Sequence, residues 1–228
     1  MVSVITCTKR IALIPQIIRN FENQTIAEKE LIIVIHGDLT EQLDICQDNI
    51  IILPFNQQKS LGECLNEAIK KSQFGIIAKF DDDDYYGPSY LKEAVSYLEN
   101  NQADLVGKET IFVYFQSTQM LGLLQLTDEK YLNLAGSTLV FRKHIAVDIP
   151  FPPLSLGEDA AFLEGCHKKS FHMASTSPFH YVYVRYSNAH HTSTIKNEQL
   201  MRRCRVIKKT HDFKPFVNQE EGDKLDEE

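Results

Sequence analysis

The sequence predicts an α/β fold with a mostly parallel central sheet and helices on both faces. In the first hundred residues, short apolar runs alternate with helical patterns, as in sheets built from strand–helix–strand units. Residues 31–35 are continuously apolar, which is typical of a strand that helices cover on both sides. Four consecutive aspartates at 81–84 follow another apolar run, and such sheets bind ligands at the carboxyl ends of their strands.

The elements of the first half are marked by local signals. Ser60 and Glu63 have the S-x-x-E spacing of a capping box, which predicts a helix over LGECLNEAIKKS. Pro88 fits the first turn of a helix that continues SYLKEAVSYLENN. In chain order, we expect strands at 2–6, 31–35, 50–53 and 76–80, and helices from about residue 11, after Ser60 and from Pro88.

The second half is less regular. Glu158 and Asp159 follow Gly157 and begin a helical pattern, where negative charge suits a helix N-terminus. The basic pattern at 195–209 also indicates a helix. We expect strands at 104–107, 111–115, 135–142, 171–173 and 181–184.

Composition limits the class of protein. The 228 residues suit one domain, which we place at 1–216, followed by an acidic tail at 217–228 that we expect to be disordered. A net charge of −7 argues against nucleic-acid binding. Five cysteines without a C-x-x-C pair favour reduced thiols and a cytoplasmic location. We find no signal peptide or membrane-spanning run, and peripheral membrane association stays open.

The four adjacent aspartates indicate a metal site. Unpaired, their charges would repel one another and lower stability. A solvated turn is the alternative, but the run lies between an apolar strand and a helix start. A hard divalent cation, Mg²⁺ or Mn²⁺, is the natural counter-charge. An EF-hand is excluded, because its glycine and glutamate would fall at Tyr86 and Lys92; a D-x-D pair, Asp81 and Asp83, fits instead.

Six segments together resemble one known family. In chain order they are VSVITCT, NQT with ELIIVI, FNQQKSLGECLNEAI, FDDDDYYGPSYL, GED and RYSNAHHTS. This order resembles a family 2-type glycosyltransferase with the GT-A nucleotide-diphospho-sugar transferase fold, over roughly residues 2–195. The resemblance implies transfer from a nucleotide-diphosphate sugar, with a UDP-sugar first in preference, to a glycan, lipid-linked or protein acceptor. It implies a donor-binding half at about 1–108 and an acceptor half at about 109–216.

The resemblance also implies roles for individual residues. Asp83 would be the main metal ligand, helped by Asp81 and by His190 or His191, although the two histidines could equally belong to an exposed polar loop. Asp159 would be the base of an inverting reaction, and Glu158 would position the acceptor; the simpler reading of this pair is helix N-terminal charge. Donor-binding residues would be Thr6, Thr8, Lys59, Gly62, Asn66, Asp81 and Asp82, with Asp84 in a supporting role.

Two departures and two other function classes keep alternatives open. His36-Gly37-Asp38 stands where the family commonly has two aspartates, so the nucleotide base is not fixed, and Lys59 stands where a small residue is common. A nucleotidyltransferase usually has a glycine-rich N-terminal loop, which VSVITCTKR lacks. A non-catalytic carbohydrate-binding relative would need neither the acidic run nor the Glu158–Asp159 pair.

Overall fold

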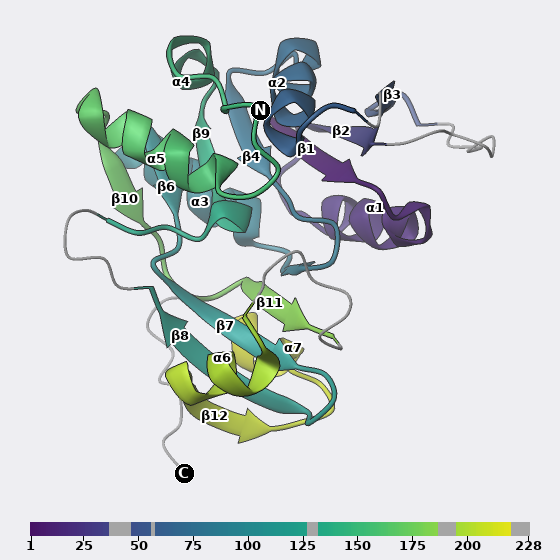
Figure 1. Cartoon of the computed structure of the whole chain (residues 1–228), viewed down its shortest axis with the longest axis vertical. Coiled ribbons are helices and arrows are strands. Elements are labelled where there is room, and N and C mark those ends of the chain that lie inside the picture. The colour runs from purple at the N-terminus through teal and green to yellow at the C-terminus, as the bar shows by residue number, and fades with distance from the viewer. Residues whose placement is uncertain (37–46, 56–57, 127–131, 187–194, 220–228) are drawn as a thin grey trace.

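Two β-sheets organise the chain in the computed structural model, which describes residues 1–36, 47–55, 58–126, 132–186 and 195–219 (Figure 1). In the first sheet β9 runs antiparallel to both of its neighbours, and the other pairs are parallel. This confirms the mostly parallel sheet that the sequence predicts. Its strands in spatial order are β10 (Met173–Ser175), β6 (Leu105–Gly107), β9 (Val140–Arg142), β4 (Ile76–Lys79), β1 (Val2–Thr8), β2 (Lys29–His36) and β3 (Ile50–Phe55).

Helices cover both faces of this sheet because its strands are apolar on both sides. Val4 and Ala78 pack toward α1 (Ile14–Glu22) and α3 (Tyr90–Asn100). Their neighbours Ile5 and Ile77 point to the opposite face, as the pleat requires, and pack with α2 (Leu61–Lys71), α4 (Lys143–Asp148) and α5 (Glu158–Lys168). In Figure 1, α5 crosses in front of the sheet and α3 lies behind it.

The second sheet lies below the first in Figure 1 and is mostly antiparallel. One of its faces joins the core of the first sheet, and α7 (Lys214–Val217) packs on the other. Its strands in spatial order are β12 (Arg205–Lys209), β8 (Met120–Gln125), β7 (Thr110–Phe115), β11 (Tyr181–Arg185) and β5 (Tyr85–Tyr86).

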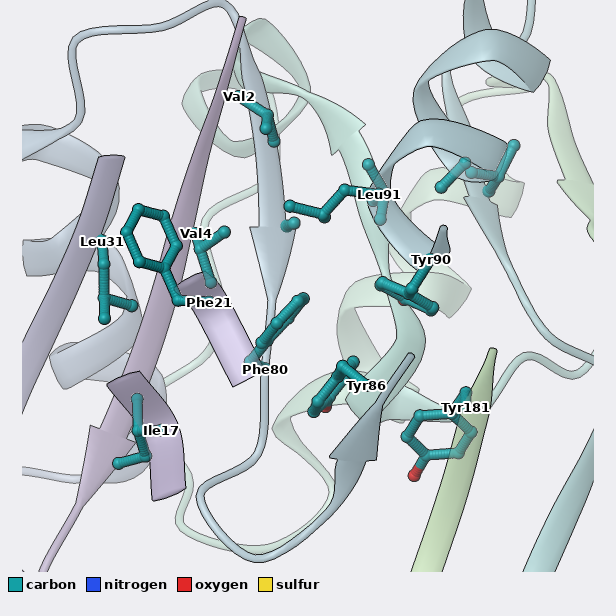
Figure 2. Close-up of a cluster of buried hydrophobic side chains, with 14 of the residues drawn as sticks. Val2, Val4, Ile17, Phe21, Leu31, Phe80, Tyr86, Tyr90, Leu91 and Tyr181 are labelled. Atoms are coloured by element: carbon teal, nitrogen blue, oxygen red, sulfur yellow. The ribbon is translucent and has the colours of Figure 1, made fainter. Parts of the chain in front are cut away.

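Aromatic rings join the two sheets at the end of β4. The Phe80 and Tyr86 rings are stacked, with centroids 3.6 Å apart, and Tyr86 lies 5.3 Å from Tyr181 of β11 (Figure 2). Stacked aromatic pairs add to the stability gained by burial alone. The segment that carries the four aspartates, between Phe80 and Tyr85, is therefore held at the junction of the two sheets.

Several sequence predictions need correction. Pro88 precedes the N-cap Ser89, so α3 begins two residues after it. The predicted strand at 135–142 is shortened to β9, because η2 (Gly136–Thr138) is a 3₁₀ turn. The predicted helix at 195–209 is α6 (Asn197–Arg203) followed by β12, which completes the edge of the second sheet beside β8. The capping box of α2 is confirmed.

The first residue of the expected tail, Val217, belongs to the folded part of the chain. Val217 is fully buried in the core of the second sheet, and the Asn218 amide donates to Tyr85 Oη at 2.8 Å. The folded part of the chain thus includes residue 217, and residues 220–228 lie outside the described ranges. No helix in the described part of the chain is long and apolar enough to cross a membrane.

Candidate active site

The carboxylate of Asp84 anchors the acidic segment to the second sheet. Its side chain is 1% exposed, its Oδ2 accepts from Tyr181 Oη at 2.6 Å, and its Oδ1 accepts from the Val184 amide at 3.1 Å. Burial and the charges of Asp83 and Asp81 raise the pKa of Asp84 well above its ordinary value. Asp84 therefore holds the acidic segment against the second sheet, and its supporting role at a metal site stays a prediction.

Arg10 is the counter-charge of the next two carboxylates. Its guanidinium pairs with Asp82 and lies 2.9 Å from Asp83 Oδ2, and Thr8 Oγ1 also donates to Asp82. Burial and the charge of Asp82 raise the pKa of Asp83 to about 6, although Arg10 opposes this shift. Burial and the neighbouring Asp82 thus disfavour the ionised form of Asp83 even beside Arg10.

Asp81 has a different cation. Its Oδ1 lies 2.7 Å from Nζ of Lys79, the last residue of β4, and 43% of the Asp81 side chain is exposed. The Asp81 amide donates to Tyr86 Oη at 2.8 Å, and that hydroxyl donates to the Ser137 carbonyl at 2.7 Å. Tyr86 thereby ties the acidic segment to η2.

The predicted catalytic pair reaches the same place from α5. Gly157 is the N-cap at φ +80°, a conformation that glycine adopts without strain, and Glu158 begins the helix. A Cβ added to Gly136 of η2 would lie 1.6 Å from Asp159 Oδ2, so the Asp159 carboxylate packs directly on η2. Burial raises the pKa of Glu158, and Lys79 opposes this shift.

Lys79 connects the two groups of acids electrostatically. Burial lowers the pKa of Lys79, but Asp81, Asp159 and Glu158 outweigh burial, so the pKa is raised overall. Lys79 therefore forms an ion pair with Asp81 and also lies within the electrostatic influence of the Glu158–Asp159 pair.

The other predicted donor-binding residues have local partners. Thr6 is fully buried, without a hydrogen-bond partner for Oγ1 among the described residues, whereas Thr8 reaches the acidic segment. Lys59 pairs with Glu63 at 2.7 Å. The Gly62 amide donates to the Leu154 carbonyl, and the Asn66 side chain bonds the Phe151 backbone in both directions.

These hydrogen bonds place Gly62 and Asn66 of α2 against the loop at residues 151–154. A Cβ on Gly62 would lie 1.9 Å from the Pro152 carbonyl oxygen, so only glycine lets the start of α2 approach this loop. Both residues hold α2 against the segment that leads to α5. A direct contact of Lys59, Gly62 or Asn66 with a donor stays a prediction.

The carboxylates suit a hard divalent cation. Asp81 and Asp83 offer oxygen ligands, and the raised pKa of Asp83 indicates a site that added positive charge would stabilise. Within the described ranges, no three His, Cys, Asp or Glu side chains are grouped as a ready-made metal site. His190 and His191, the further ligands expected from the sequence, lie outside those ranges, as do Gly37 and Asp38.

Five residues of the site were missed by the sequence analysis. Lys79 gave a signal, because it is a lysine inside the apolar strand pattern IIAKF. The other four depend on contacts between residues far apart in the chain, which sequence spacing does not reveal. They are Arg10, Tyr86, Gly136 and Tyr181.

Comparisons with known proteins agree with this arrangement. The model of the family described as Glycosyl transferase family 2 matches residues 3–150. The amylovoran biosynthesis glycosyltransferase AmsE of Erwinia amylovora is 24% identical over 92 residues, which are 38% of this chain and 35% of AmsE.

Solved structures share the fold. S. aureus TarS 1–349 in complex with UDP-GlcNAc has a TM-score of 0.65 and 19% identity, over 85% of this chain and 61% of that chain. The mannosyltransferase PcManGT from Pyrobaculum calidifontis, in complex with GDP-Man and Mn²⁺, has a TM-score of 0.56 and 14% identity, over 81% and 56%. The chain spans less than two thirds of each of these relatives. The similarity confirms the GT-A fold expected from the sequence.

Proposed function

Because the chain belongs to glycosyl transferase family 2, we propose that it moves a sugar from a nucleotide-diphosphate sugar to an acceptor hydroxyl, with a divalent metal ion and inversion at the anomeric carbon. The observation that carries this proposal is that Asp81, at the carboxyl end of β4, and Asp159 meet at the same short turn, η2. Tyr86 Oη joins the Asp81 amide to the Ser137 carbonyl of η2, and the Asp159 carboxylate packs on Gly136 of η2. A UDP-sugar is the first candidate donor, since TarS is solved with UDP-GlcNAc and with UDP.

On the donor side, Asp83 and Asp81, with His190 or His191, would hold Mn²⁺ or Mg²⁺. When bound, the ion supplies positive charge that stabilises the leaving nucleotide diphosphate. Asp82 keeps the segment in shape through Thr8 and Arg10, so that Asp83 is presented beside a fixed guanidinium. The donor would occupy the exposed side of Asp81.

On the acceptor side, Asp159 is the candidate general base. Its carboxylate is held by the Ala160 amide at 2.7 Å and by contact with Gly136. An inverting transfer needs one carboxylate to take the proton of the acceptor hydroxyl as that oxygen attacks the anomeric carbon. Glu158, which is 4% exposed, would orient the acceptor or Asp159.

A thermal-shift panel of nucleotide sugars, each with Mn²⁺ and with EDTA, tests the donor part of the proposal. A true donor at 100 times its Kd adds about 2.7 kcal/mol to the free energy of unfolding. We expect one nucleotide series to stabilise the protein only when metal is present. Transfer to an acceptor panel follows, with the product configuration read by NMR. Equal binding in EDTA contradicts metal dependence, and a product that retains the donor configuration contradicts inversion.

A further inference from the structure

Positive charge is concentrated in one stretch near the end of the folded part of the chain. Residues 195–214 carry seven Lys and Arg against two acids, whereas the whole chain has a net charge of −7. Five of these cations lie at the end of α6 and in β12, and all five residues are exposed: Arg202, Arg203, Arg205, Lys208 and Lys209. We call these five residues, together with Val206 among them, the α6–β12 surface.

The fold places the α6–β12 surface away from the candidate active site. β12 is one edge strand of the second sheet, and β5, which follows the acidic segment, is the opposite edge. Figure 1 shows β12 on the side of the second sheet that faces away from the first sheet, with α6 beside it. Leu200 of α6 is buried, and a Cβ added to Gly122 of β8 would lie 2.8 Å from the Cys204 Cβ. These contacts hold α6 on the sheet and leave its arginines outside.

The cations of this surface have no carboxylate partner in the described part of the chain. Lysines elsewhere pair with a nearby glutamate, as Lys168 does with Glu164 at 2.7 Å and Lys70 with Glu67 at 3.5 Å. Among the described residues, no ion pair joins any of the five cations to an acid. Like charges held close together repel one another, so this arrangement lowers stability unless an anionic partner compensates it.

Two features select the class of anionic partner. Charged side chains on an edge strand oppose pairing with the edge of another chain, which argues against a second copy as the partner. Val206 is 54% exposed, so an aliphatic side chain stands among the cations. This combination suits the headgroup region of an anionic membrane, where lipid phosphates lie beside acyl chains. Single-stranded nucleic acid is instead bound by cations together with aromatic rings, and the α6–β12 surface contains no aromatic residue.

We propose that the α6–β12 surface binds membranes that contain anionic phospholipids. The five cations contact the lipid phosphates, and the Val206 side chain enters the region between the headgroups. Each Lys or Arg near an anionic membrane strengthens binding by roughly fivefold, and salt screens this effect. The inference goes beyond the proposed sugar transfer and does not rest on it.

Vesicle co-sedimentation of the whole chain tests the proposal. Vesicles of phosphatidylcholine alone are compared with vesicles that also contain phosphatidylglycerol, at about 0.1 M and about 1 M salt, where the Debye length falls from ~10 Å to ~3 Å. We expect binding to the phosphatidylglycerol vesicles at low salt and its loss at high salt. Absence of that binding, equal binding to both kinds of vesicle, or binding that salt does not change overturns the proposal.

Two matched double variants locate the binding surface. Arg205→Gln with Lys209→Gln removes two charges from β12 and should weaken vesicle binding roughly 25-fold. Lys71→Gln with Lys92→Gln removes two exposed charges from α2 and α3 and should bind like the parent. Equal losses in the two double variants overturn the assignment to this surface. Circular dichroism checks folding, and if the first double variant does not fold, Arg203→Gln alone is measured, with an expected loss of about fivefold.

Val206→Thr distinguishes a membrane from nucleic acid. Threonine keeps the shape and strand preference of valine but replaces a methyl group by a hydroxyl group. Binding to phosphatidylglycerol vesicles should weaken roughly two- to fourfold, because less apolar surface enters the membrane. Parental vesicle binding by Val206→Thr overturns the proposal, as does tighter binding of a single-stranded RNA oligonucleotide than of the vesicles, measured by fluorescence anisotropy. UDP titration of the same proteins is a separate readout: absence of UDP binding in the parent refutes the UDP-sugar donor and leaves the membrane surface standing.

Discussion

Gly136→Ala should disable transfer by displacing one carboxylate. A Cβ at this position would lie 1.6 Å from Asp159 Oδ2, 2.4 Å from its Cγ and 2.7 Å from its Cβ. Ordinary contact begins at 3.4 Å, so the oxygen must retreat by about 1.8 Å and the Asp159 Cβ by about 0.7 Å. Rotation of the carboxylate alone relieves the first clash but leaves the second, so the start of α5 must also move.

The backbone of Gly136 tolerates the change. Among the described residues, Gly157 is the glycine with a positive φ, and Gly136 is not in that region. Alanine therefore brings no backbone strain, and the protein should fold. A shift of about 1.8 Å in a general base predicts a loss of at least ~100-fold in kcat, because about 1 Å of misplacement already costs that much. UDP affinity should stay within a few-fold of the parent.

Gly75→Ala is the matched control, because a Cβ at Gly75 meets nothing within 4 Å. Single-turnover transfer and calorimetric UDP titration are measured for the parent and both variants. Gly75→Ala should match the parent in both measurements. If a folded Gly136→Ala protein also transfers at the parental rate, the position of the Asp159 carboxylate does not matter, and Asp159 is not the base.

Three further predictions concern the carboxylates and the late loop. Asp159→Asn should reduce the rate of transfer by roughly 10²–10⁴-fold while donor affinity stays within a few-fold of the parent. Glu158→Gln should act mainly on the acceptor KM, and steady-state kinetics separate these two effects. Asp83→Asn should abolish Mn²⁺-dependent UDP binding in calorimetry, whereas Asp82→Asn, which loses contacts to Thr8 and Arg10, should weaken it less. Ala at His190 or at His191 should weaken Mn²⁺–UDP binding at whichever position supplies a ligand, and parental binding by the double variant would exclude ligation by this loop.

Much of the fold could be read from the sequence because its signals are local. The capping box at Ser60 and the apolar strand runs each depend on residues a few positions apart, and the structure confirms both. The ends of helices and strands are predicted less accurately where tertiary contacts decide them. The pattern at 195–209 looks helical, yet Arg205 onward pairs with β8, because the edge of the second sheet offers backbone partners that a longer helix would leave unpaired.

The site could be predicted only in part, for a similar reason. The four aspartates and the Gly157-Glu158-Asp159 motif are contiguous, so their residue types were visible. Arg10 approaches Asp82 across 72 positions, and Tyr181 approaches Asp84 across 97. From the sequence, one divalent cation is expected as the counter-charge of the acidic run, whereas the fold also supplies Arg10 and Lys79.

Burial and the charge of Asp82 outweigh Arg10 at Asp83, which predicts that stability depends on pH through this carboxylate. The pKa of Asp83 rises from 3.8 in the unfolded chain to about 6 in the fold, so the folded state binds the proton more tightly. The stabilising effect of that proton is gained as pH falls through about 6 and is lost as pH rises. From pH 7 to pH 5 the free energy of unfolding should gain roughly 1 kcal/mol from this group.

Urea unfolding in EDTA at the two pH values measures this gain. Asp83→Asn should remove it and stabilise the protein at pH 7, apart from the lost contact with Arg10. Asp48→Asn, at an exposed position, is the control and should follow the parent at both pH values. The raised pKa of Asp84 acts in the same direction, and the charge of Asp83 is one of its causes, so the difference between the parent and Asp83→Asn reports Asp83 together with its effect on Asp84. If the free energies of unfolding of the parent and Asp83→Asn differ by the same amount at pH 5 and at pH 7, folding does not raise the pKa of Asp83. The fold then does not disfavour the ionised carboxylate that a divalent ion would stabilise.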